Sequence, residues 1–341
     1  QFDQYQAQQG ILEREVKSAQ HVYDLFLGEA KEASLASELV ATNVVIADPA
    51  TPASKPSRPR KVANTILGLL SGLVFGLGIA IGLDHFDQSL KGPRDLASYL
   101  PTIAFLGAIP RVKHLETQEP MILRGPRALP ALEAFRSIRT SIMLSGMIPD
   151  HGSLVITSSG PDEGKSTVAV NLAFAMAQIE DGRVLLIDAD LRSSHPGSLF
   201  LLKGDGIRGL GDFLDGDAEF DDVVHHSGES NLWTIPPGKV TTNPSELLSS
   251  RRMKLLLEKC RTAGYFVIMD TPPVTLFSDA VILGSRADGV MLIVGAGQAD
   301  REACQLAGHR IVQAGGRLLG VVLQKAMGPR LSHYSQYAQI Q

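Results

Sequence analysis

The stretch SLVITSSGPDEGKSTVAVNLAFAMA, residues 153–177, decides the fold of this 341-residue chain. A short apolar run with β-branched residues leads into a glycine-containing loop, and Lys165 then opens a helical pattern. The loop SGPDEGKS, residues 159–166, has the spacing of a phosphate-binding loop, with serine where the first glycine usually stands. Because the order is strand, loop and helix, the stretch predicts a P-loop rather than a simple turn.

The chemistry of phosphate binding explains this layout. Backbone N–H groups of the loop and of the helix start point at phosphate oxygens. Gly164 lets the backbone approach closely, Lys165 reaches the terminal phosphates, and the Ser166 hydroxyl suits Mg²⁺. We therefore predict ATP and Mg²⁺ as cofactors. The predicted nucleotide contacts are Ser159, Gly160, Pro161, Asp162, Glu163, Gly164, Lys165, Ser166 and Thr167.

Further apolar runs alternate with helical patterns downstream of the loop. The predicted strands are residues 154–157, 184–187, 265–269, 290–294 and 318–323. Strands separated by helices predict an α/β fold, with a doubly wound, mostly parallel sheet and helices on both faces. We place this P-loop domain at residues 131–328.

Three aspartates follow predicted strands. Asp188 and Asp190 come just after one strand, and Asp270 comes just after another. In a doubly wound sheet, ligands bind at the carboxyl ends of the strands, so these side chains should converge on one Mg-nucleotide. The predicted metal ligands are Ser166, Asp188 and Asp270. A single aspartate after a strand is usually a helix cap, but three beside a P-loop favour a site.

The first part of the chain has a different character. Residues 1–45 predict the end of a coiled-coil-like helical region, because apolar residues recur at alternating steps of four and three from Leu12 to Ala33. A plain amphipathic helix of a small domain is the alternative. Residues 46–61 hold four prolines and predict an extended linker.

Residues 62–83 contain no charged side chain and are long enough to cross a bilayer as a helix. A buried core helix is the rival interpretation, and the charged flanks argue against it. Positive charges before the span would place its N-terminal side in the cytosol. A P-loop domain needs cellular ATP, however, so we expect residues 84 onward to be cytosolic, with 84–130 a juxtamembrane linker.

Charge and cysteine content exclude other classes of protein. The net charge is −4, so no global field points to nucleic acid, and no nucleic-acid partner is expected. The two cysteines, Cys260 and Cys304, form no disulfide framework or zinc spacing, and both are expected to be buried thiols.

The motif formed by Asp188, Asp190 and Arg192 resembles the second Walker motif of bacterial tyrosine kinases, the BY-kinases, which are fused or paired with polysaccharide chain-length determinant (co-polymerase) proteins. Glu133, Arg136 and Arg139 resemble the ExxRxxR helix that this family uses in ring assembly. The stretches GLGDFL (209–214) and PGKVTTNPSELL (237–248) are also similar to the family. The resemblance covers essentially the whole chain and implies an earlier membrane span before Gln1.

The resemblance implies phosphoryl transfer from MgATP to a tyrosine hydroxyl. Lys165, Asp188, Asp190 and Arg192 are the catalytic residues it implies: Asp188 helps to take the tyrosine proton, Asp190 assists, and Arg192 orients the pair. Gln324 stands where related ATPases often carry an asparagine near the adenine. The tail 329–341 holds only Tyr334 and Tyr337, which would be the phosphate acceptors in place of the family's tyrosine cluster.

The family also implies partners and a location. The expected partners are further copies of this chain in a homo-oligomeric ring with tails phosphorylated in trans, the polysaccharide polymerase and export machinery, and a tyrosine phosphatase. The expected location is the inner (cytoplasmic) membrane of a bacterium, with the catalytic domain in the cytoplasm and a role in capsule or exopolysaccharide synthesis.

Two other functions remain open. A partitioning or cell-division-site ATPase shares the fold, but such proteins carry a lysine five residues before the P-loop lysine, where this chain has Gly160. A nucleotide-gated co-polymerase scaffold would bind ATP and form a ring without phosphorylating anything. The short tyrosine tail is the best support for the scaffold.

Overall fold

The structure is a computed structural model, and it describes residues 2–39, 58–86, 89–112, 128–179, 182–192, 202, 206–228, 231–239 and 243–326. The chain divides into two compact units, Gln1–Ala80 and Ile81–Gln341. The predicted linker between the first helix and the apolar segment lies almost wholly outside the described residues, and so do Tyr334 and Tyr337.

Two long helices occupy the first part of the chain. Helix α1 (Phe2–Leu39) is continuous, and its apolar side chains, such as Val16, Tyr23 and Phe26, are exposed. A partner helix for this seam remains a prediction. Helix α2 (Lys61–Phe86) includes the stretch Lys61–Leu83, which is long and apolar enough to cross a membrane by length and composition.

A single eight-stranded sheet forms the centre of the second unit. Its order is β1-β8-β7-β2-β6-β3-β5-β4, and every pairing is parallel except that of β4 with β5. The predicted parallel sheet and its five strands are confirmed. The strands are β1 (Phe105–Pro110), β2 (Ser153–Ser158), β3 (Arg183–Asp188), β4 (His225–His226), β5 (Leu232–Ile235), β6 (Tyr265–Asp270), β7 (Gly289–Gly295) and β8 (Leu318–Ala326).

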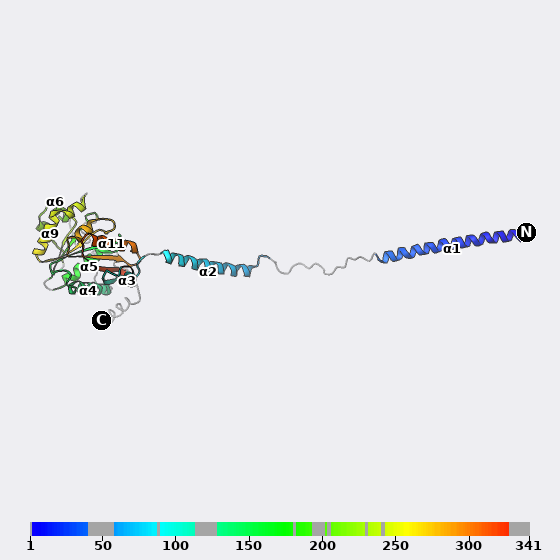
Figure 1. Ribbon diagram of the computed structural model, residues 1–341, viewed down its shortest axis with the longest axis horizontal. Coiled ribbons are helices and arrows are strands. Elements are labelled where there is room, and N and C mark those ends of the chain that lie inside the picture. The colour runs from blue at the N-terminus through cyan, green and yellow to red at the C-terminus, as the bar shows by residue number, and fades with distance from the viewer. Residues whose placement is uncertain are drawn as a thin grey trace. The chain divides into compact units, whose positions relative to one another are not determined.

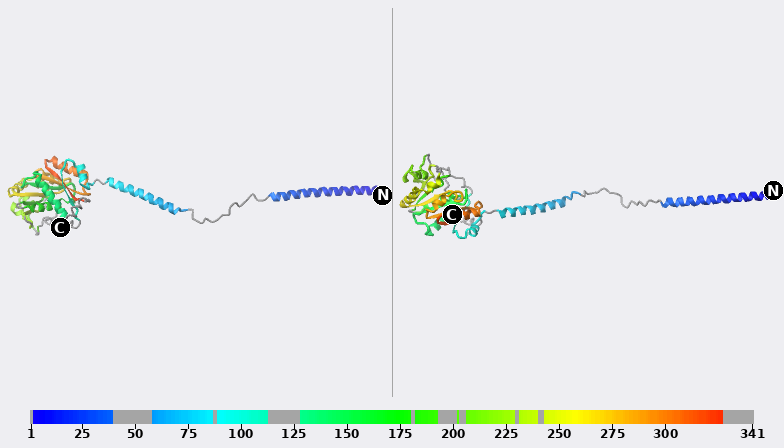
Figure 2. Two further views of the ribbon diagram at one scale, coloured as in Figure 1. Left: turned by 90° about the horizontal axis from the view of Figure 1, so that it is seen from below. Right: turned by 45° about the horizontal axis from the view of Figure 1, so that its top comes forward.

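Helices cover both faces of the sheet (Figures 1 and 2). Alternate residues of a strand point to opposite faces, so Val155 joins one apolar core whereas Leu154 and Ile156 join the other. Helices α4 and α5 pack on the second core, and the helices α3 and α6 to α11 pack on the first. The helices are α3 (Pro93–Tyr99), α4 (Leu129–Leu144), α5 (Lys165–Ala177), α6 (Leu210–Asp215), α7 (Phe220–Val223), α8 (Pro244–Ser249), α9 (Arg251–Thr262), α10 (Asp279–Gly284) and α11 (Arg301–Gln313).

The predicted start of the domain at residue 131 is wrong. Residues 84–130 were expected to be a juxtamembrane linker, but they contribute α3 and the edge strand β1, which pairs with β8. Leu90 and Leu96 are fully or almost fully buried in the core. The glycine and the proline in FLGAIP are atypical of a strand, so the sequence pattern did not predict one here. An edge strand tolerates both residues, because only one of its sides must pair.

Candidate functional site

The P-loop connects the buried strand β2 to helix α5. Gly164, the residue before α5, has φ 89, in the left-handed region that favours glycine. A Cβ atom at this position would lie 2.8 Å from Cγ of Gln324, so a larger residue would collide. The start of α5 has no side-chain cap, which leaves its first N–H groups to face an anion. The predicted strand–loop–helix context is confirmed.

The side chains of two predicted nucleotide contacts point into the protein. Ser159 Oγ donates to Oε1 of Glu163 at 2.5 Å, and Sγ of Cys304 donates to Ser159 Oγ at 3.3 Å. Ser159 and Glu163 are both buried. Any contact of these two residues with a nucleotide would therefore come from the backbone, while their side chains brace the loop from beneath. Both cysteines are buried, as expected.

Glu163 makes stability depend on pH. Burial, opposed by the hydrogen bond from Ser159, raises the pKa of Glu163 from 4.5 to about 7. Between these two pKa values the folded chain keeps a proton that the unfolded chain releases. The contribution of Glu163 to the free energy of unfolding is therefore complete below pH 4.5 and is lost as the pH rises to about 7. We expect Glu163→Gln to reduce the fall in stability between pH 5 and pH 8 by about 3 kcal/mol.

Thermal or urea unfolding without nucleotide measures this effect. Glu258→Gln is the matched control, because Glu258 is an exposed glutamate of α9 that forms a loose pair with Lys254 at 3.8 Å. The control should follow the wild-type pH profile. An identical profile for Glu163→Gln would contradict the buried, protonated glutamate.

The three predicted aspartates meet Lys165 at the carboxyl ends of three neighbouring strands. Asp188 and Asp270 are the last residues of β3 and β6, and their Cα atoms are partners across the sheet. Nζ of Lys165 lies 3.4 Å from Oδ2 of Asp190 and 3.4 Å from Oγ of Ser166. The Asp190 N–H donates to Oδ1 of Asp188 at 3.0 Å. The structure thus brings Lys165, Ser166 and the three carboxylates together.

Burial and repulsion shape the charges of this cluster. Burial and the charge of Asp270 hold the pKa of Asp188 well above its ordinary value. Burial likewise raises the pKa of Asp270 to about 6, although Lys165 and a hydrogen bond with Ser166 lower it. Burial alone would lower the pKa of Lys165, but Asp270 and Asp190 raise it above its usual value. The cluster therefore favours a bound cation.

The donor set fits Mg²⁺ held jointly with phosphate oxygens. Oδ1 of Asp270 is buried without a hydrogen-bond partner among the described atoms, so it has a free acceptor. Within the described ranges no group of three or more His, Cys, Asp or Glu side chains is arranged to hold a metal by itself. Mg²⁺ commonly takes one or two carboxylates plus substrate phosphates, and Ser166, Asp188 and Asp270 would supply the protein's share.

Among the described contacts, Arg192 forms no hydrogen bond with Asp188 or Asp190, the two carboxylates that it was predicted to orient. Its guanidinium donates to both carboxylate oxygens of Asp279, from Nε at 2.7 Å and from Nη2 at 3.0 Å. Asp279 was not predicted, because it stands 87 residues downstream of Arg192 and no motif marks it.

Gln324 lies beside the loop, at the end of β8. It packs against Gly164, and its Oε1 is buried without a hydrogen-bond partner in the described part of the chain. This leaves an acceptor for a ligand near the predicted adenine position. The adjacent Lys325, which sequence reasoning missed, donates from Nζ to the carbonyl oxygen of Asp162 at 3.1 Å and braces the loop from outside.

The predicted oligomerisation residues lie on α4. Nη1 of Arg136 contacts Oε1 of Glu133 at 2.5 Å, and both side chains are about half exposed. Nη1 of Arg139 instead donates to the carbonyl oxygen of Ala175 at 2.6 Å, which joins α4 to α5 within the chain. Glu133 and Arg136 are therefore open to a neighbouring molecule, whereas Arg139 also has a structural role. Ring assembly remains a prediction.

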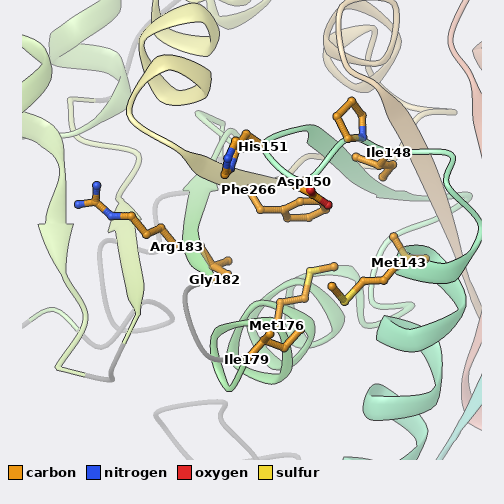
Figure 3. A pocket seen from close by; sticks show the side chains of 12 residues that line it. Met143, Ile148, Asp150, His151, Met176, Ile179, Gly182, Arg183 and Phe266 are labelled. Atoms are coloured by element: carbon orange, nitrogen blue, oxygen red, sulfur yellow. The ribbon is translucent and has the colours of Figure 1, made fainter.

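A separate cavity of about 370 Å³ lies at the opposite ends of the strands, where β3 and β6 begin. Figure 3 shows Met143, Met176 and Phe266 among the side chains that line it. Ligands of open α/β sheets bind at the carboxyl ends of the strands, so this cavity is not the nucleotide site.

Two family profiles match the chain. The G-rich domain on putative tyrosine kinase matches residues 6–83, and the CobQ/CobB/MinD/ParA nucleotide binding domain matches residues 154–341. The second match covers more than half of the chain, so the P-loop unit is a nucleotide-binding domain. The first match, with the apolar helix α2, indicates membrane anchoring.

Named relatives agree with these profiles. The tyrosine-protein kinase etk of Escherichia coli (strain K12) is 31% identical over 95% of this chain, which spans 47% of that relative's length. The tyrosine-protein kinase YwqD of Bacillus subtilis (strain 168) is 38% identical over 60% of this chain and 84% of its own. The solved kinase domain of Escherichia coli tyrosine kinase ETK superposes with a TM-score of 0.62, at 33% identity over 70% of this chain and 96% of that domain. The chain belongs to the family of bacterial tyrosine-protein kinases built on a CobQ/CobB/MinD/ParA-type nucleotide-binding domain.

Proposed function

We propose that the chain is an ATP-dependent protein-tyrosine kinase that phosphorylates its own tail at Tyr334 and Tyr337. The observation that carries this proposal is the meeting of Lys165 with three carboxylates at the ends of β3 and β6, beside an uncapped helix start. The names of the relatives support the same activity. The polymer whose synthesis it serves would be a capsular or exopolysaccharide.

The residues divide the work of transfer between them. Lys165 neutralises the terminal phosphates, and the loop backbone orients them. When bound, Mg²⁺ supplies further positive charge to the transferring phosphoryl group. Asp188 accepts the proton as the tyrosine oxygen bonds to the γ-phosphorus and the bond to the leaving ADP breaks. Because its pKa is raised, Asp188 is a stronger base than an ordinary aspartate.

Phosphotyrosine mapping tests the activity. The full chain in detergent, given ATP and Mg²⁺, should gain phosphotyrosine on Tyr334 and Tyr337, and a chain with both changed to Phe should gain none. Nucleotide binding without any phosphotyrosine in the wild type would overturn the kinase and favour the scaffold.

The kinase unit would lie in the cytoplasm of a bacterium, anchored in the inner membrane by α2. The composition of the span supports crossing, and the need for cellular ATP sets its direction. The partners would be further copies of the chain, the polysaccharide polymerase and export machinery, and a tyrosine phosphatase.

Cysteine labelling checks this topology. In spheroplasts, a membrane-impermeant maleimide should label an Arg60→Cys chain from outside and label a Lys91→Cys chain only after permeabilisation. The native thiols give little background, because Cys260 and Cys304 are buried. The reverse pattern would mean that the positive charges before the span, rather than the nucleotide site, set its orientation.

A further inference from the structure

The ion pair of Arg192 and Asp279 ties the loop after β3 to the start of α10. It is bidentate, and the Asp279 side chain is 0% exposed while that of Arg192 is 30% exposed. A bidentate pair of guanidinium and carboxylate fixes the orientation of the arginine side chain and also neutralises its charge. Buried charges are rare unless they are paired, so Asp279 has a structural reason to hold Arg192.

Ser245 joins the pair from a third element, α8. Its Oγ donates to Oδ1 of Asp279 at 2.5 Å, and Nη2 of Arg192 lies 2.8 Å from the same hydroxyl. The guanidinium also stacks on the ring of Phe277, 4.3 Å from its centroid. We call Arg192, Ser245 and Asp279 the clamp. It gives a physical role to the stretch 243–248, which the nucleotide site does not use.

The clamp holds one end of the loop that carries the catalytic carboxylates. At the strand end, the Ala189 N–H donates to the carbonyl oxygen of Asp270 at 2.8 Å. One residue later, Asp190 faces Lys165. Two residues after that, Arg192 enters the clamp. The described hydrogen bonds of the Arg192 guanidinium go to Asp279 and Ser245. Arg192 therefore acts on Asp190 through its charge and through the loop backbone that joins them, and not through a described hydrogen bond.

We propose that Asp279 is a positioning residue for phosphoryl transfer, which holds Arg192 together with Ser245 and thereby fixes Asp188 and Asp190 opposite Lys165. The inference rests on the proposed kinase function. The proposal predicts different effects on turnover and on nucleotide affinity, because Lys165 and the P-loop backbone are anchored by β2 and α5 and not by the clamp. Loss of the clamp should therefore lower turnover and leave nucleotide affinity almost unchanged.

Asp279→Asn tests this with little change of shape. The amide keeps one acceptor oxygen, but it loses the charge and turns an N–H₂ group toward donors. We expect kcat to fall by about 10²-fold, the usual cost of a displacement of about 1 Å in a catalytic group, while the affinity for ATP stays within about twofold of wild type.

Asp288→Asn is the matched control. Asp288 accepts two hydrogen bonds from Nη2 of Arg261, at 2.9 and 2.7 Å, and also binds the Ser153 N–H at 2.8 Å. This ion pair lies where β2 begins, at the end of the sheet opposite the nucleotide site. Its loss should lower stability without changing kcat. An equal fall of kcat in both variants would show a general structural effect and overturn the clamp.

A double-mutant cycle and amide exchange complete the test. In an Arg192→Ala background, Asp279→Asn should cause no further loss of kcat, and a multiplied loss would mean that Asp279 acts by another route. Without nucleotide, the Asp190 amide should exchange faster in Asp279→Asn than in wild type or Asp288→Asn. This readout needs no kinase activity, so it decides on the clamp even if the wild type makes no phosphotyrosine. Exchange at Asp190 as slow in Asp279→Asn as in wild type would overturn the proposal.

Ser245→Ala is the second variant, for use if Asp279→Asn does not fold. It keeps the ion pair of Arg192 and Asp279, so it should lower kcat and speed the exchange of the Asp190 amide to a smaller degree. A Ser245→Ala chain with the kcat and the exchange rate of the wild type would overturn the proposal.

Discussion

Lys165→Met is expected to weaken ATP binding by roughly 10- to 100-fold. The ammonium group of Lys165 lies at the start of α5 beside the carboxylates of the site. A hydrogen bond to a charged group contributes about 1.5–3 kcal/mol, or roughly 10- to 100-fold in affinity. Methionine keeps most of the length of the side chain but none of its charge. Without Lys165, less positive charge offsets the repulsion between Asp188 and Asp270, which raises the pKa values of these two groups further.

Nucleotide titration of the full chain in detergent measures this loss. Lys254→Met is the control, because Lys254 is an exposed lysine of α9 that lies 3.8 Å from Glu258, on a helix that takes no part in the site. The control should bind ATP as the wild type does. Unchanged affinity in Lys165→Met would remove the P-loop assignment altogether.

Asp188→Asn and Asp270→Asn are each expected to lower turnover by about 10²- to 10⁴-fold, the range that a positioned acid or base contributes. Asp188 would lose its capacity to take the tyrosine proton. Asp270, whose Oδ1 is buried without a hydrogen-bond partner among the described atoms, would lose its negative charge and one of the two oxygens that could bind Mg²⁺. The measurement is kcat for phosphotyrosine formation at saturating ATP and Mg²⁺. Asp217→Asn, at an exposed pair with Lys239, is the matched control and should keep wild-type turnover.

The same two variants should not lose stability in the absence of Mg²⁺. The folded-state pKa of Asp270 is about 6, and that of Asp188 is also raised. As the pH rises these groups become charged while they are buried and mutually repelling, so a neutral amide relieves a cost that grows with pH. At pH 8 the variants should melt at or above the wild-type temperature. Lower melting together with normal turnover would show that the carboxylates serve the fold rather than the reaction.

The sequence predicted the parts of the fold that repeat a strong pattern. Five buried parallel strands read as apolar runs, and the P-loop motif placed Lys165 where β2 meets α5. Strand β1 escaped because FLGAIP holds Gly107 and Pro110 and lies at the sheet edge, where pairing is needed on one side only. The short pair β4 and β5 has too few residues to show a period.

The site was predicted unevenly for a related reason. Asp188, Asp190 and Asp270 follow strands, and the topology of a parallel sheet brings strand ends together, so their meeting could be inferred. The partner of Arg192 could not be, because Asp279 and Ser245 are brought to it by the packing of α8 and α10. The motif also gave no sign that the side chains of Ser159 and Glu163 face inward, since both orientations satisfy the same spacing.

Transfer between chains is the most direct test of the proposed kinase. A Lys165→Met chain with an intact tail is mixed, in detergent with ATP and Mg²⁺, with an active chain in which Tyr334 and Tyr337 are both Phe. We expect phosphotyrosine on the Lys165→Met chain, because its tail would enter the neighbour's nucleotide site. If a separate wild-type sample gains phosphotyrosine but the Lys165→Met chain in the mixture does not, transfer occurs within one chain. A wild type that binds ATP and carries no phosphotyrosine would contradict the kinase and leave a nucleotide-gated scaffold as the function.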